Sequence, residues 1–272
     1  MNYQMSLPRV TVLLANYNDE DYIVKAYNSA VKQDYKGPLC VCIIDDGSTD
    51  GSWDRIEGIS FFNQGVSRQK DGEVEIFSDT LNLKGEIKKR SLVAIKKPNG
   101  GPSDARNEGI KHTFESTDIY AVLDSDDEMK PNKITKCVDI MLEDMDRIGA
   151  VYADYDTYTI NTGRMIREFK EPFSRRRLVE ECIVHSGSII NKKALIDVKE
   201  DTGYYDKTMR VCEDYDLWMR ISEKYMIVHI PESLTLVRVT GDNSSFVVNK
   251  DIWEQNWKKI RDKLHARANE KI

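Results

Sequence analysis

The chain has 272 residues, of which 40% are hydrophobic and 32% are charged, and its formal net charge is −6. This composition is ordinary for a globular protein and leaves room for one large domain or two small ones. No apolar run approaches the roughly 18–20 residues of a membrane-spanning helix, and residues 1–8 contain no apolar signal-peptide core. Because the chain is acidic and its longest basic run is residues 175–177, we expect no nucleic-acid partner.

The cysteines indicate a reducing compartment. Their number is odd and none shows C-x-x-C spacing, so we expect neither a disulfide framework nor a zinc site. We therefore expect a cytoplasmic protein with mostly buried thiols. The cysteines are Cys40, Cys42, Cys137, Cys182 and Cys212.

Two apolar stretches near the N-terminus each lead into a polar turn. Residues 9–14 form a β-branched strand before residues 15–18, and residues 39–44 form a second strand before residues 45–51. Asp19 is placed to cap a helix after the first turn. This repeated unit of strand, turn and helix predicts a doubly wound, mostly parallel sheet covered by helices.

The interval from about residue 53 to residue 97 gives weaker patterns. Residues 91–95 can join the sheet as a strand, while residues 73–77 indicate an inserted hairpin within about 60–90. A loop rich in glycine and proline follows, and Ser103 or Asp104 can cap the helix after it.

A strand over residues 119–123 ends in a cluster of acids. Asp124, Asp126, Asp127 and Glu128 stand together just after it. Clustered carboxylates repel one another, and their hard oxygen atoms suit Mg²⁺ or Mn²⁺. The carboxyl ends of strands are also where open α/β sheets bind ligands. The alternative is a solvated acidic turn that caps the next helix.

The C-terminal half predicts mixed structure. A helix that opens with Glu213 and Asp214 has two acids in its first turn, where the helix dipole favours them. The other predicted elements are a helix over 133–145, paired strands over 150–158 and 165–169, a helix over 174–182, a strand over 186–190, a helix over 192–198, strands over 226–230 and 234–239, and a helix over 251–268.

Five separated motifs, taken in order, resemble the family 2 glycosyltransferases, which are inverting, metal-dependent enzymes that use nucleotide sugars. The resemblance covers roughly residues 8–240. The motifs are ANYN at 15–18, DDGSTD at 45–50, NGGPSDARNEG at 99–109, LDSDD at 123–127 and CEDYDLWMR at 212–220.

The resemblance implies the GT-A fold, an α/β architecture with a mostly parallel, Rossmann-like sheet. It implies a single domain over residues 1–250, divided into a donor half at about 8–130 and a smaller mixed acceptor half at about 131–245. Residues 251–272 would form a C-terminal helix.

The resemblance also implies a donor site. Asp46 would accept a hydrogen bond from the base, and Arg106 would hold its loop or contact the donor. Asp126 would ligate Mn²⁺ or Mg²⁺, and Asp124 would contact the ribose or the metal and its water shell. The residues implied to bind the nucleotide sugar are Ala15, Asn16, Tyr17, Asp45, Asp46, Gly100, Gly101, Arg106, Asp124 and Ser125.

Asp214 matches the family's general base. One carboxylate beside the attacking hydroxyl, with no second carboxylate as nucleophile, predicts inversion by direct displacement. The family implies a donor, UDP-linked by resemblance, and an acceptor that is a saccharide or a lipid-linked saccharide. His185, Glu213 and Trp218 are expected on the acceptor side, although His185 could equally be a buried structural residue.

Three other functions compete with this hypothesis. A sugar-nucleotidyltransferase would need a basic, glycine-rich loop, which residues 15–18 do not provide. A phosphatase with an aspartyl nucleophile at Asp124 would place Thr or Val where Glu128 stands. A non-catalytic nucleotide-sugar-binding protein would lack the base, whereas Asp214 is present. Two departures from the family are Ala15, where proline is usual, and the long interval between residues 50 and 99.

Some features keep two interpretations. Arg238 with His229 would either reach the diphosphate or form a surface ion pair. Trp253 and Trp257 are four residues apart and would contact the core or a second copy in a homodimer, the alternative being a platform that stacks on a sugar. Residues 175–177 would form either a solvated face or a contact with a lipid headgroup or a phosphorylated acceptor.

Overall fold

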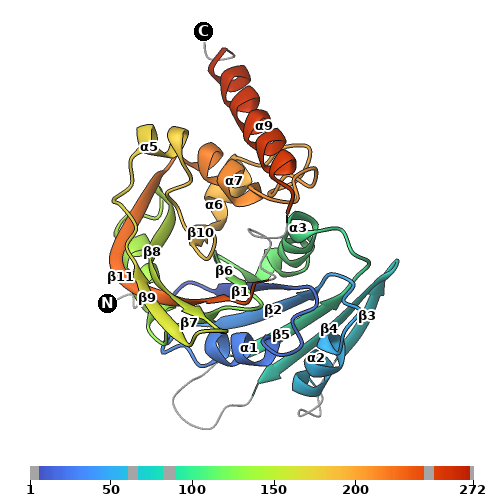
Figure 1. Ribbon diagram of the computed structural model, residues 1–272. Coiled ribbons are helices and arrows are strands. Elements are labelled where there is room, and N and C mark those ends of the chain that lie inside the picture. Colours follow the sequence, from blue (N-terminus) through green and yellow to red (C-terminus); the bar gives the residue numbers. More distant parts are fainter. Residues whose placement is uncertain (1–5, 61–66, 82–89, 242–247, 270–272) are drawn as a thin grey trace, which may run out of the picture.

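The computed structural model describes residues 6–60, 67–81, 90–241 and 248–269. A central sheet of 11 strands runs through the molecule (Figure 1). The strands are β1 (Val10–Asn16), β2 (Leu39–Asp45), β3 (Ser67–Asp71), β4 (Val74–Leu81), β5 (Arg90–Lys96), β6 (Ile119–Asp124), β7 (Glu128–Met129), β8 (Ile148–Thr159), β9 (Arg164–Glu168), β10 (Ile189–Asn191) and β11 (Met226–Val239). The main helices are α1 (Ile23–Val31), α2 (Ser52–Ser60), α3 (Pro102–Thr113), α4 (Lys133–Glu143), α5 (Arg175–Glu180), α6 (Lys192–Asp197), α7 (Glu213–Ile221) and α9 (Lys250–Asn269).

The centre of the sheet is parallel, as the repeated strand-turn-helix units predict. Strands β5, β2, β1 and β6 lie side by side in that order, and each pairs in parallel with its neighbour. Asn16 on β1 is in register with Asp45 on β2, and Ala15 is in register with Asp124 on β6. The polar turns that follow these strands therefore meet at one edge of the sheet.

The second half of the sheet is mixed. Strand β10 is antiparallel to both β6 and β8, and β11 is parallel to β8. The prediction of two strands at 226–230 and 234–239 is wrong, because β11 is continuous from Met226 to Val239. Register shifts between Ile230 and Thr235 absorb the Pro231 turn signal as a β-bulge.

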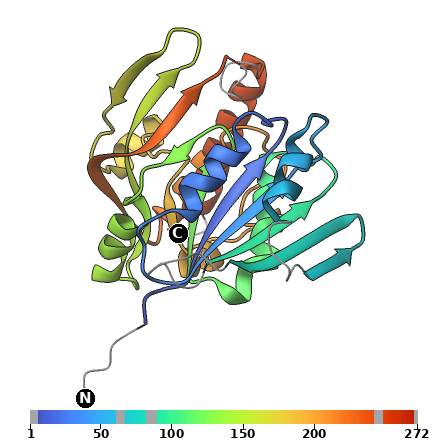
Figure 2. The same cartoon turned by 90° about the horizontal axis from the view of Figure 1, so that it is seen from below.

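Helices cover both faces of the sheet and enclose two apolar cores. One core joins α1, α2 and α4 to one face, and the other joins α3, α6 and α7 to the opposite face. Figure 2, seen from below, shows α1 and α2 lying across the strands. Both faces of the central strands are buried, which accounts for their almost continuously apolar sequences.

Two predicted helix caps are wrong. Helix α1 begins at Ile23 without a side-chain cap, and the carboxylate of Asp19 instead accepts a hydrogen bond from the Ser125 hydroxyl. Helix α3 begins at Pro102, with Gly101 as its N-cap at a φ of 88°. Glycine adopts this left-handed conformation without a steric penalty, so the chain can turn into the helix at Gly101 without a side-chain cap.

Two elements extend the sheet and helix layers at their edges. The β3–β4 hairpin lies in the interval where a hairpin is expected, and β4 pairs antiparallel with β5. At the other end, α9 packs on α7 and buries Ile260. None of the described helices is both long enough and apolar enough to cross a bilayer.

Ion pairs also hold α9. The ammonium nitrogen of Lys263 is 2.8 Å from a carboxylate oxygen of Asp216 on α7 and 3.1 Å from one of Asp206. Both aspartates are almost fully buried. Arg220 also pairs with Asp216, at 2.8 Å. Buried carboxylates need such partners, so α9 is electrostatically tied to the helix that carries Asp214.

Helix α3 approaches the sheet closely at Gly109. A Cβ atom there would lie 2.8 Å from Ile44 Cδ1 and 2.9 Å from Leu13 Cδ2. Gly109→Ala should lower the free energy of unfolding by about 1–3 kcal/mol, because extra carbon overpacks a filled core. The matched change Gly58→Ala on α2 meets nothing within 4 Å, and should raise it by about 0.5–1 kcal/mol. Urea unfolding of both variants measures these changes. If Gly109→Ala left the free energy of unfolding unchanged, the close packing would be contradicted.

Candidate active site

The ends of β1 and β2 form a hydrogen-bonded polar floor. Asn16 Nδ2 donates to Asp45 Oδ1 at 2.9 Å and to the Ser48 hydroxyl at 3.1 Å. Asn16 and Asp45 are both almost fully buried. They hold the two turns together, while Tyr17 beside them remains 50% exposed. An exposed aromatic ring at a strand end can pack against a flat ligand.

Asp46 holds the glycine loop. Its carboxylate accepts hydrogen bonds from the backbone N–H groups of Gly100 at 2.9 Å and Gly101 at 2.7 Å. It also pairs with the ammonium group of Lys97 at 2.5 Å and is 3% exposed. The structure thus gives Asp46 a positioning role, and hydrogen bonding of this carboxylate to a nucleotide base stays a prediction.

Arg106 joins the acidic turn to the start of α7. Its guanidinium donates to Glu213 Oε1 at 2.5 Å and to Asp124 Oδ1 at 2.8 Å, and it is 5% exposed. Burial of the guanidinium opposes its ionisation, but Asp124 and Glu213 outweigh this effect and raise the pKa of Arg106. Its neighbour Asn107 instead holds the segment before α7, through the backbone of Tyr205.

The acidic turn is crowded with negative charge. Asp124 and Asp126 are partly exposed, whereas Asp127 and Ser125 are buried. Burial, followed by the charges of Asp126 and Asp124, raises the pKa of Asp127 well above its usual value. Several carboxylates in one turn offer the hard oxygen ligands that a divalent cation prefers.

Two cationic side chains from the second half of the chain partly offset this charge. Arg238 donates to the backbone carbonyl of Asp126 at 2.6 Å and pairs with Glu128. Lys133 is fully buried, and its ammonium group donates to Gly187 O at 2.6 Å and to the Thr235 hydroxyl at 2.7 Å. Burial lowers the pKa of Lys133 to about 8.

Asp214 lies in the first turn of α7, and the residue as a whole is partly exposed. The residue before Glu213, Cys212, has a φ of 62°, a left-handed conformation that is unusual outside glycine. Burial of the carboxyl, followed by the charge of Glu213, raises the pKa of Asp214 to about 7. The charge of Arg106 acts in the opposite direction. A carboxylate with such a pKa is suited to accept a proton near neutral pH.

The predicted acceptor residues have different surroundings. His185 is partly exposed, and its neighbour Ser186 donates to Asp124 Oδ2 at 3.3 Å. Glu213 is buried and paired with Arg106. The prediction for Trp218 is wrong, because its side chain is fully buried in the core and cannot contact an acceptor. Trp218 lies one helical turn beyond Asp214, on the face of α7 that packs inward.

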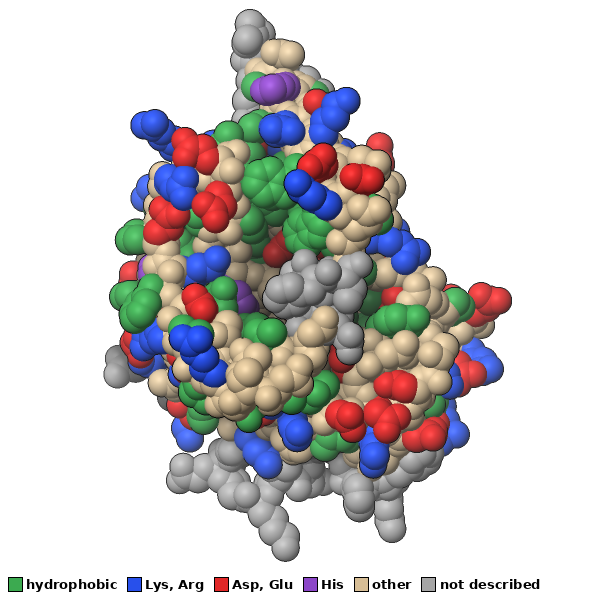
Figure 3. All heavy atoms as spheres, in the orientation of Figure 1, with side chains coloured by type: hydrophobic (Ala, Val, Ile, Leu, Met, Phe, Trp, Pro, Cys, Tyr) green, Lys and Arg blue, Asp and Glu red, His purple; other side chains and the backbone are tan. Residues whose placement is uncertain are grey.

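Figure 3 shows a hollow at the centre of one face, below α7 in the orientation of Figure 1. Hydrophobic side chains form much of its wall, and acidic and histidine side chains are visible inside it. A concave, largely apolar wall with a few polar groups is the usual form of a small-molecule site.

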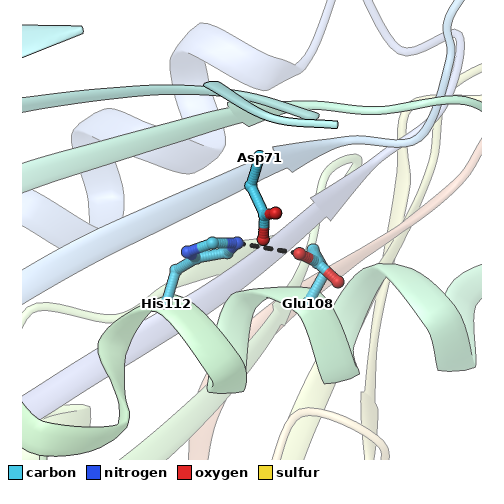
Figure 4. A group of neighbouring side chains, drawn as sticks. All are labelled: Asp71, Glu108 and His112. Carbon is cyan, nitrogen blue, oxygen red and sulfur yellow. Dashed lines mark hydrogen bonds and ion pairs between the residues drawn. The ribbon is translucent and has the colours of Figure 1, made fainter. Parts of the chain in front are cut away.

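A second acidic cluster lies on α3 and the β3–β4 hairpin (Figure 4). The ligand atoms of Asp71, Glu108 and His112 are within 4.8 Å of one another. The ammonium group of Lys111 already pairs with Asp71 at 2.7 Å and with Glu108 at 2.9 Å. This cluster does not include Asp124 or Asp126, so it is separate from the predicted metal ligands.

The features that kept two interpretations in the sequence have the following surroundings in the structure. His229 pairs with the buried Asp154 while the buried Arg238 binds the acidic turn, so these two residues do not form a surface ion pair, and a diphosphate contact by Arg238 stays a prediction. Trp253 and Trp257 pack against the second core. Arg177, in the basic run, pairs with surrounding glutamates.

Two lysines of this site, Lys97 and Lys133, were not predicted from the sequence. Strands β2 and β5 are parallel and Asp45 is in register with Lys96, so the next residue, Lys97, comes at the same edge of the sheet. The strand register alone could therefore have indicated Lys97 as a site residue. Lys133 gave no such signal, because it opens an ordinary amphipathic helix and is buried only by contacts with Gly187 and Thr235.

Sequence comparisons agree with the family that the motifs resemble. The sequence profile of Glycosyl transferase family 2 matches residues 11–199. The chain is 26% identical over 255 residues to an uncharacterized glycosyltransferase of Haemophilus influenzae, which covers 90% of this chain and 69% of that protein. It is 26% identical over 251 residues to a chondroitin synthase of Pasteurella multocida, which covers 92% of this chain but 22% of the synthase.

Solved structures share the fold. The S. aureus protein TarS in complex with UDP-GlcNAc has a TM-score of 0.63 at 19% identity, over 90% of this chain and 64% of that chain. Mannosyltransferase PcManGT from Pyrobaculum calidifontis, in complex with GDP-Man and Mn²⁺, has a TM-score of 0.60 at 17% identity, over 88% of this chain and 59% of that chain. These neighbours are GT-A glycosyltransferases, so the predicted GT-A fold is confirmed. Because the family profile matches well over half of its residues, this chain belongs to glycosyl transferase family 2.

Proposed function

We propose that this chain transfers a sugar, with inversion, from a UDP-linked donor to a hydroxyl of a saccharide or lipid-linked saccharide. The observation that carries the proposal is the bridge made by Arg106. It joins Asp124, in the acidic turn expected to hold the donor, to Glu213, directly beside the expected base. Family membership supports the reaction class, and UDP is favoured because the motifs resemble enzymes that use it.

The proposed reaction forms one bond, breaks another and transfers one proton. The acceptor oxygen forms a bond to the anomeric carbon while the bond from that carbon to the diphosphate oxygen breaks. The acceptor proton passes to Asp214, and the nucleoside diphosphate leaves with the bonding electron pair. A raised pKa near 7 makes Asp214 a stronger base than an ordinary carboxylate and still leaves much of it ionised at neutral pH.

We also propose that Asp126, with Asp124, holds Mn²⁺ or Mg²⁺. The crowded carboxylates of the acidic turn fit such a cation, because Asp124 and Asp126 repel the charge of Asp127. When bound, the cation would act as a Lewis acid that offsets negative charge on the departing diphosphate. The protein's own part is to fix the turn, through Arg106 on one side and Arg238 on the other.

The same proposal covers the organisation of the chain. Residues 1–250 would form one catalytic domain, with the donor half before about residue 130 and the acceptor half after it. Its location would be cytoplasmic or peripheral to a membrane. The chain spans 69% of the Haemophilus relative and 22% of the Pasteurella synthase. In these longer relatives, the region that matches this chain is joined to further segments.

Donor and metal binding can be tested together. UDP, GDP, dTDP and CDP would be added with and without Mn²⁺ while the melting temperature is followed. UDP with metal should stabilise the protein by about 2.7 kcal/mol at a hundredfold excess over its Kd. Asp126→Asn should abolish that shift, and the exposed control Asp54→Asn should keep it. Stabilisation by another nucleotide would reject UDP, and none by any nucleotide would reject the donor site.

Asp214→Asn should keep the metal-dependent UDP shift and reduce transfer by about 10²–10⁴-fold, because the base is lost. In the unmodified protein the base works only when ionised, so kcat/KM should rise with pH and level off above a pKa of about 7. Initial rates between pH 5 and 9 measure both effects. A flat profile, or normal turnover by Asp214→Asn, would remove Asp214 from this role.

The rise of kcat/KM with pH is called the acid limb of the profile. Arg106→Gln should move the midpoint of this acid limb to a pH about one unit higher, since the nearby positive charge of Arg106 favours ionisation of Asp214. The exposed control Arg176→Gln should leave the limb in place. The pH profile separates this effect from simple unfolding, because damaged packing lowers the rate at every pH without moving the limb. An unmoved limb in a folded Arg106→Gln protein would contradict the electrostatic role.

A further inference from the structure

Three side chains beside the acidic turn are unused by the proposed reaction. Tyr155 on β8 and His185 lie ring against ring, with centroids 4.4 Å apart. The ammonium nitrogen of Lys170, just after β9, lies 5.9 Å from the centroid of Tyr155. All three are partly exposed. We call Tyr155, Lys170 and His185 the β8–β10 patch, because it spans the segments between these strands.

His185 is held as a neutral hydrogen-bond donor. The backbone N–H of Gly187 donates to its Nδ1 at 3.0 Å, so the ring proton is carried by Nε2. Burial, followed by the charges of Lys133 and Lys170, lowers the pKa of His185 to about 3. The imidazole therefore offers Nε2–H to a ligand oxygen and does not exchange a proton near neutral pH.

Lys170 keeps its charge available. Its backbone N–H donates to Asp154 at 2.9 Å, which fixes the chain, while its ammonium group lies over Tyr155. Within residues 6–60, 67–81, 90–241 and 248–269, no carboxylate makes an ion pair with this ammonium group. By contrast, the basic run after it is matched by glutamates at Arg177.

The β8–β10 patch adjoins the acidic turn. Ser186, next to His185, donates to Asp124 Oδ2 at 3.3 Å, which ties the patch to the acidic turn. On the other side, the charges of Asp214 and Lys170 both act on the thiol of Cys182. The patch therefore adjoins the acidic turn, and Lys170 and Asp214 both lie close enough to Cys182 for their charges to act on its thiol.

We propose that the β8–β10 patch binds an anionic group, a carboxylate or a phosphate, on the acceptor saccharide. Lys170 supplies the opposite charge, His185 donates a hydrogen bond to an oxygen of that group, and the ring of Tyr155 contacts the apolar face of a sugar. This inference rests on the proposed function and narrows its acceptor class. Lys133 and Lys170 both place positive charge near His185, while Glu168, Asp127 and Asp124 are the carboxylates whose charges reach the patch.

The test is initial-rate kinetics with three acceptors: an oligosaccharide that contains uronic acid, its carboxyl-reduced neutral form, and a polyol-phosphate oligomer. One anionic acceptor should have a KM about tenfold below that of the neutral form, as expected for one charge-assisted hydrogen bond. Lys170→Met should remove this advantage and leave kcat and the donor KM unchanged, and Lys170→Arg should restore it. Which anionic acceptor responds distinguishes carboxylate from phosphate.

Lys199→Met is the matched control, because Lys199 also lies over a tyrosine ring, 5.1 Å from the centroid of Tyr204, and should change nothing. His185→Gln, which retains an N–H donor, should preserve more of the preference than His185→Phe. Equal KM values for anionic and neutral acceptors, or a raised donor KM in Lys170→Met, would overturn the inference. If no acceptor turns over, calorimetric titration of the same oligosaccharides decides it, and absent binding overturns it. Loss of metal-dependent UDP binding in the unmodified protein would instead defeat the proposed function.

Discussion

The buried guanidinium of Arg106 is the interaction on which the arrangement of the site depends. It comes from α3 and bonds to Asp124 at the end of β6 and to Glu213 at the start of α7. A buried cation with two carboxylate partners avoids much of the penalty that either charge would have alone. If it were absent, the two acids Asp124 and Glu213 would lose the cation that they share.

The same logic extends to the second half of the chain. The acidic turn is contacted by Arg238 from β11, and Lys133 from α4 binds the segment that carries His185. Arg238 is distant in sequence from Asp124, and Lys133, although it follows the acidic turn closely, contacts the distant Gly187 and Thr235. The acceptor half is therefore joined to the donor half by charge as well as by β6–β10 pairing. The mixed part of the sheet is what brings these groups to the acidic turn.

The sequence predicted the features that are local. Apolar β-branched runs indicated β1, β2 and β6, and parallel packing then placed Asn16, Asp45 and Asp124 at one edge. Family resemblance added the expected roles. It could not predict which face of α7 packs inward, so Trp218 was misplaced, or that β11 continues through Pro231. Lys133 and Lys170 derive their surroundings from contacts between distant segments, which no local pattern encodes.

The ion pairs between α9 and α7 limit how this sequence can drift. Lys263 faces the buried carboxylates of Asp206 and Asp216, and Asp216 lies two residues after Asp214. A single change at Lys263 would leave those charges with fewer partners, whereas a paired change could exchange one compatible set for another. Positions 206, 216 and 263 should therefore covary among descendants of this protein. Sequence constraints on α7 would then extend to α9 through these ion pairs.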